Sequence, residues 1–128
     1  MTTYELMMKI KEILEANGYE TRSPKFANKK DYEVQFSASK DGKYYTTQYD
    51  YNGLWGATKL TKHHGYKIEV EYVYRSNGTS ENVSVDIMIF ALKDSSGWRI
   101  AKERVNTHMS DKSVLNRVKK IMDAYEAL

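Results

Sequence analysis

The spacing of apolar residues changes twice along the chain, and this change constrains the fold more than any other feature. At both ends, apolar residues recur every three to four positions, as in an amphipathic helix. Between the ends, apolar and polar residues alternate with a period of two, as in half-buried strands. The pattern predicts a single α+β domain over residues 1–128, with an antiparallel sheet of about five strands between two helices.

The two terminal segments carry helix start and stop signals. Thr2 and Glu5 have the spacing of a capping box, and Asn17-Gly18 supplies a stop, so we predict a helix over residues 3–17. A second helix is expected over residues 111–127, capped by Ser110 or Asp111. Its apolar stripe, which is typical of a core-facing surface, consists of Val114, Leu115, Val118, Ile121, Met122 and Tyr125.

The first two predicted strands, 31–39 and 43–51, flank an Asp41-Gly42 pair, which is a strong signal for a hairpin turn. Pairing them about this turn gives one face that meets the core. That face holds Tyr32, Val34, Phe36, Ala38, Tyr45, Thr47, Tyr49 and Tyr51.

Three further strands are predicted at 66–75, 82–92 and 97–105, with Asn77-Gly78 in the first turn between them. The strand 82–92 is apolar on both faces, as is typical of a central strand covered twice. Either the two helices cover opposite faces of the sheet, or both cover one face and the other meets a partner. The second arrangement predicts self-association, as a homodimer, through Met88, Phe90, Leu92 and Val73.

Composition excludes several classes of protein. The chain has no cysteine, which excludes disulfides, thiolate metal sites and a cysteine nucleophile. It shows no signal peptide and no apolar run near the roughly 20 residues needed to span a bilayer, so we expect a cytoplasmic protein without membrane contact. The net charge of +3 is compatible with nucleic acid without implying it, and it argues against an acidic mimic of DNA.

No group of residues has the pattern of an active site. Glu33 and Asp50 would face each other in the first hairpin, where two carboxylates can share a proton or hold a divalent cation, but we expect them to be solvated. His63, His64 and His108 lack the spacing of a metal site, and the glycines lack that of a phosphate-binding loop. We therefore expect no enzyme activity, no metal and no cofactor.

The segment NGLWGATKLTKHHG, residues 52–65, is interpreted as a 14-residue connection between two hairpins. No acid occurs between Asp50 and Glu69, and residues 22–30 form a second acid-free basic run. Trp55 is either a contact for a partner or a cap on the core. The predicted binding residues are Trp55, Lys59, Lys62, His63, His64, Lys67, Tyr44, Lys29 and Lys30.

Two functions fit these residues. The first is a small non-enzymatic protein that occupies the surface of a protein partner. By analogy, compact chains of this style are common among phage and mobile-element inhibitors of bacterial nucleases and defence complexes, anti-CRISPR proteins included. The alternative is a single-stranded nucleic-acid-binding protein, with cations for phosphates and Tyr or Trp for base faces.

Overall fold

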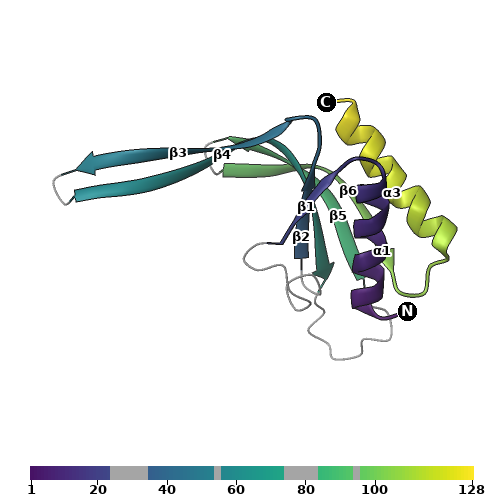
Figure 1. Cartoon of the computed structure of the whole chain (residues 1–128). Coiled ribbons are helices and arrows are strands. Elements are labelled where there is room, and N and C mark those ends of the chain that lie inside the picture. Colours follow the sequence, from purple (N-terminus) through teal and green to yellow (C-terminus); the bar gives the residue numbers. More distant parts are fainter. Residues whose placement is uncertain (24–34, 54–55, 74–83, 94–95) are drawn as a thin grey trace.

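A computed structural model of the chain describes residues 1–23, 35–53, 56–73, 84–93 and 96–128 (Figure 1). The helices are α1 (Thr3–Ala16) and α3 (Asp111–Glu126). The strands are β1 (Glu20–Arg22), β2 (Gln35–Ser39), β3 (Tyr44–Gly53), β4 (Gly56–Val73), β5 (Ser84–Lys93) and β6 (Ser96–Asn106). The predicted order of helix, antiparallel sheet and helix is confirmed.

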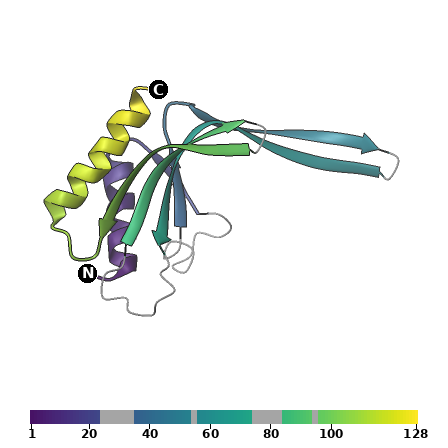
Figure 2. The same cartoon turned by 180° about the vertical axis from the view of Figure 1, so that it is seen from behind.

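The strands form one antiparallel sheet in the order β1-β2-β4-β5-β6, with β3 paired to β4 outside this order. Both helices cover the same face of the sheet (Figures 1 and 2). Between the helices and the sheet lies a core that includes Leu6, Ile10, Phe36, Ile68, Val85, Ile87, Val118, Ile121 and Tyr125. Of the two helix arrangements left open by the sequence, the structure therefore has the one with both helices on one face. Among the described residues, no helix combines the length and apolar character needed to cross a membrane.

The helix caps follow the sequence signals. The Thr2 hydroxyl accepts a hydrogen bond from the Glu5 backbone N–H at 3.1 Å, and the Ser110 hydroxyl accepts one from the Ser113 N–H at 3.2 Å. Each bond satisfies a donor at a helix N-terminus that has no intrahelical partner. The capping residues therefore decide where both helices begin.

The predicted hairpin between residues 31–39 and 43–51 is wrong. β2 and β3 do not pair with each other, because both pair with β4: Ala38 lies opposite Ile68, and Tyr44 lies opposite Gly65. Asp41 and Gly42 do have positive φ angles, of 58° and 66°, as a tight turn requires. Residues 40–43 form a turn between β2 and β3. After this turn β3 pairs with the next part of β4, instead of folding back to pair with β2.

The predicted 14-residue connection is also wrong, because β4 begins at Gly56 and runs for 18 residues. Residues 56–65 of β4 carry Thr, Lys and His at most positions, so they lack the apolar alternation of a core strand. They pair with β3 along their whole length nevertheless. A strand that covers no core needs no apolar face, and apolar periodicity cannot detect it.

The remaining hairpins match the prediction. β4 pairs with β5 from Gly65–Leu92 to Val73–Ser84, and β5 pairs with β6 from Ser84–Asn106 to Lys93–Ser96. The turn residues Asn77 and Gly78 lie outside the described residues. The three-residue strand β1 was not predicted, because three residues are too few to show a period.

Candidate functional site

β3 and residues 56–65 of β4 form a two-stranded arm that extends beyond the rest of the sheet (Figures 1 and 2). The arm contains ten antiparallel cross-strand pairs, from Tyr44–Gly65 to Gly53–Gly56. β5 pairs with β4 only from Gly65 to Val73, so within the described part of the chain residues 56–64 pair with β3 alone. At about 3.3 Å per residue, ten residues give the arm a length of roughly 30 Å.

Strand register assigns the arm positions to two faces of different chemistry. Directly opposed residues of an antiparallel pair share a face, and successive residues alternate between faces. One face, called the tyrosine face, comprises positions 45, 47, 49, 51, 58, 60, 62 and 64, which hold Tyr, Thr, Tyr, Tyr, Thr, Leu, Lys and His. The other, called the polar face, comprises positions 44, 46, 48, 50, 52, 57, 59, 61 and 63, which hold Tyr, Thr, Gln, Asp, Asn, Ala, Lys, Thr and His.

At the base of the arm each face holds a stacked Tyr–His pair, and on the polar face the ring centroids of Tyr44 and His63 are 5.8 Å apart. On the polar face, the Tyr44 hydroxyl lies 2.8 Å and the Thr46 hydroxyl 3.2 Å from Nδ1 of His63. On the tyrosine face, the rings of Tyr45 and His64 stack, with centroids 5.0 Å apart and planes inclined by 10°. Tyr45 is 54% exposed, so the prediction that it faces the core is wrong and an aromatic surface is open to contact.

Tyr125, near the C-terminus of α3, holds the base of the arm to the body. Its hydroxyl accepts a hydrogen bond from the Lys40 backbone N–H at 3.1 Å and donates one to the Tyr66 carbonyl at 3.1 Å. The ammonium of Lys40 pairs with Glu126 at 2.5 Å. Burial raises the pKa of the Tyr125 phenol, since an apolar environment disfavours the phenolate. These contacts join the last turn of α3 to Lys40, in the turn that precedes β3, and to Tyr66 of β4, next to the base of the arm.

Gly65 permits the close approach of the two strands at this point. Its φ angle is +94°, and a Cβ atom there would lie 1.8 Å from the carbonyl oxygen of Lys43. The same oxygen accepts a hydrogen bond from the Tyr66 N–H at 2.8 Å. A residue with a side chain at position 65 would therefore disrupt the junction of arm and body.

The arm gathers some of the residues predicted for binding. Tyr44, Lys62, His63 and His64 lie near the base of the arm, and register places Lys59 opposite Asp50. Lys67 lies on β4 within the sheet, where its ammonium pairs with Glu69 at 2.7 Å. Three of the predicted residues lie outside the described part of the chain: Lys29, Lys30 and Trp55. The expected meeting of the two basic runs stays a prediction.

The residues predicted for self-association lie on the sheet face away from the helices. Met88 is only 5% exposed within the single chain, while Phe90 and Leu92 are partly buried. Register places Glu69 and Lys102 directly beside Met88. Met88 is thus removed from solvent without a second copy, and homodimer formation through this face stays a prediction.

Asp86 occupies the same face and is buried, at 8% exposure. Its carboxylate accepts two hydrogen bonds from Arg104, at 2.7 Å from Nε and 3.2 Å from the terminal guanidinium nitrogen. Lys102 lies 3.7 Å from the same carboxylate. A buried charge that is bonded on both oxygens is a structural ion pair, and this geometry leaves little of the carboxylate for chemistry.

The expected opposition of Glu33 and Asp50 involves a residue outside the described part of the chain and stays a prediction. Asp50 lies opposite Lys59, because β3 pairs with β4 and not with β2, and Glu33 lies outside the described residues. Within the described ranges, no group of three or more His, Asp or Glu residues is placed to hold a metal ion.

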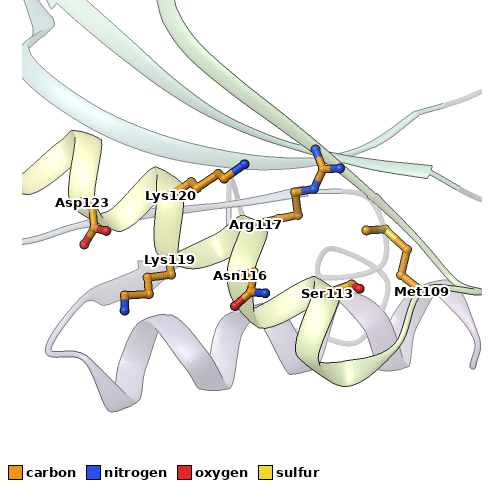
Figure 3. A pocket seen from close by; sticks show the side chains of 7 residues that line it. All are labelled: Met109, Ser113, Asn116, Arg117, Lys119, Lys120 and Asp123. Atoms are coloured by element: carbon orange, nitrogen blue, oxygen red, sulfur yellow. The ribbon is translucent and has the colours of Figure 1, made fainter.

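A surface hollow of about 410 Å³ lies along α3 (Figure 3). It is lined by Met109, Ser113, Asn116, Arg117, Lys119, Lys120 and Asp123. Arg117 and Lys120 extend toward the sheet, whereas Lys119 and Asp123 extend from the other side of the helix (Figure 3). Arg117 also pairs with Glu103 at 2.9 Å. Because its polar groups do not converge on one point, the hollow lacks the arrangement of a small-molecule site.

Comparisons of the chain with protein-family models, curated proteins and solved structures find no match.

Proposed function

We propose that this chain is a non-enzymatic binding protein that uses its arm to occupy the surface of a protein partner. Its mode of action is steric, as in phage and mobile-element inhibitors of bacterial nucleases and defence complexes, anti-CRISPR proteins among them. The observation that carries the proposal is an arm of ten cross-strand pairs beside which the described chain packs no further strand. A two-stranded ribbon is at best marginally stable alone, so contact with another molecule accounts for its length.

The charge of the arm favours a protein partner over a nucleic acid. Its charged residues are Asp50, Lys59 and Lys62, which give a net formal charge of +1 with both histidines neutral. Nucleic-acid affinity rests on several cations that neutralise phosphates. A weakly charged surface rich in tyrosine is instead typical of the centre of a protein interface.

The proposed location of the protein is the cytoplasm. A chain without cysteine forms no disulfides, so the reducing environment of that compartment does not affect its stability. A defence complex or nuclease in the same compartment is accessible to it.

Titration with oligonucleotides tests the proposal against its alternative. Labelled single- and double-stranded oligonucleotides are titrated with the full chain at about 50 mM and about 200 mM salt, and binding is followed by fluorescence anisotropy. We expect no saturable binding at either salt concentration. Tight binding that weakens steeply with salt, and that falls further in Lys59→Gln and Lys62→Gln, would overturn the proposal in favour of a nucleic-acid-binding protein.

A further inference from the structure

We infer that the arm contacts its partner through the tyrosine face, and that the partner offers an apolar protein groove bordered by carboxylates. This inference rests on the proposed function and specifies the contact surface and the chemistry of the partner.

The apolar residues of the arm are concentrated on one face. Register assigns Tyr45, Tyr49, Tyr51 and Leu60 to the tyrosine face, whereas the polar face holds Tyr44 at its base and polar or small residues beyond it. Tyrosine combines a large apolar ring with a polar hydroxyl and is enriched at the centres of protein interfaces. The tyrosine face therefore has the composition of an interface centre.

At the base of the arm, side chains of the polar face lie within hydrogen-bond distance of one another. Tyr44 and Thr46 both lie within hydrogen-bond distance of His63, and all three belong to that face. Tyr45, at the matching height of the tyrosine face, makes a ring contact with His64 and keeps more than half of its surface exposed, at 54%. The difference favours the tyrosine face as the one that meets a partner.

The positive charge of the arm also belongs to the tyrosine face. Asp50 and Lys59 are directly opposed on the polar face, so their formal charges cancel. The tyrosine face holds Lys62 and no carboxylate position. A second copy of the chain would present the same positive charge, whereas a groove bordered by carboxylates would complement it.

A peptide selection tests both parts of the inference. The immobilised full chain is used to select peptides from a random phage-displayed library, and the selected peptides are synthesised and titrated by calorimetry. We expect sequences that combine Leu, Ile or Phe with Asp and Glu. Leu60→Ser should weaken their binding by at least about tenfold, while Thr61→Ser, the adjacent position on the polar face, should change it by less than about twofold.

The two lysines of the arm provide a second matched pair. Lys62→Gln should weaken binding by about threefold to tenfold, and Lys59→Gln by less than about twofold, because only Lys62 lies on the tyrosine face. Circular dichroism confirms that each variant is folded before its affinity is compared.

The outcomes of the peptide selection distinguish this inference from the proposed function. Peptides that bind the arm but are weakened equally by changes on either face, or that lack acidic residues, overturn this inference and leave the proposed function standing. A library that yields no peptide dependent on residues 48–61 overturns the proposed function as well. A wild-type dimer in light scattering that Leu60→Ser dissociates would show that a second copy, and not an acidic groove, occupies the tyrosine face.

Discussion

β4 passes through two regions of the molecule, and its two halves have different surroundings. In the body, Ile68 and Val70 are 0% exposed, with β2 on one side, β5 on the other and the helices above. In the arm, residues 56–64 of the same strand pair with β3 alone among the described strands. Hydrogen-bond register can therefore continue a strand well beyond the core that stabilises it. The half of β4 that lies in the arm contacts no core, so its side chains can be used to bind another molecule.

The largest expected effect comes from truncating one apolar side chain in each half of β4. Ile68→Ala should lower the free energy of unfolding by about 2–5 kcal/mol, because it opens a cavity in the core. Leu60→Ala, in the arm, should lower it by less than about 0.5 kcal/mol. Urea denaturation measures both, and a similar loss from the two variants would contradict the separation of body and arm.

Glycine substitutions at the junction should have the next largest effect. Gly65→Ala places a methyl group 1.8 Å from the Lys43 carbonyl oxygen at a φ of +94°, and we expect a loss of about 2 kcal/mol or more. Gly42→Ala is the control, because its φ of +66° is also positive but no atom lies within 4 Å of the added Cβ. That variant should lose about 1 kcal/mol. Equal losses in urea denaturation would show that the close approach at Gly65 is not tight.

Removing the Tyr125 hydroxyl should weaken the attachment of the arm without opening a cavity. Tyr125→Phe loses the bonds to Lys40 N–H and the Tyr66 carbonyl, and we expect a cost of about 1–2 kcal/mol. Hydrogen exchange at the Lys40 amide should be faster in the variant than in the wild type, and this increase should exceed any increase at the amides of α1. Unchanged protection at Lys40 would contradict the assigned hydrogen bond.

A smaller effect is expected at high pH. Burial raises the pKa of Tyr19 and of Tyr125 above the ordinary value of 10.0, because both phenols are removed from water. The unfolded chain then releases these protons above about pH 10 while the folded chain keeps them. The free energy of unfolding is therefore unaffected by these groups below that pH. It should fall above it, by at most about 1.4 kcal/mol per pH unit for each tyrosine.

Urea midpoints at about pH 9 and about pH 11 measure this fall, with Tyr19→Phe as the comparison. The variant should lose less stability over the interval than the wild type does. An equal fall in both would show that the Tyr19 phenol does not contribute to it.

The body could be predicted from the sequence because its elements face one core. Caps at Thr2 and Ser110, and the double apolar character of β5, identified the helices and the central strand. These signals arise from burial and from helix ends, which impose a period or a residue type on the local sequence. Where the structure has a core, the pattern is therefore informative.

The arm could not be predicted in the same way. Asp41-Gly42 does form a turn with positive φ at both residues, but local turn chemistry does not decide which strand the chain pairs with next. β4, the partner of both β2 and β3, lies far along the sequence, as do Gly65 and Tyr125, which contact the segment between β2 and β3. Tyr44, Lys62, His63 and His64 were found by composition alone, while Tyr45 was assigned to the core. Register places Tyr45 on the same face as Ile68, but Tyr45 lies on the arm and is 54% exposed, whereas Ile68 is buried in the body.

Shortening the arm tests the central claim most directly. Thr47 and Lys62 are directly opposed, so residues 48–61 can be replaced by Asn-Gly, a two-residue sequence that favours the tight hairpin turn. We expect the free energy of unfolding in urea to change by less than about 1 kcal/mol, and binding of the selected acidic peptides, measured by calorimetry on the same sample, to be lost. A shortened chain that unfolds far more easily, or that binds those peptides with wild-type affinity, would contradict the division of the molecule into a stabilising body and a binding arm.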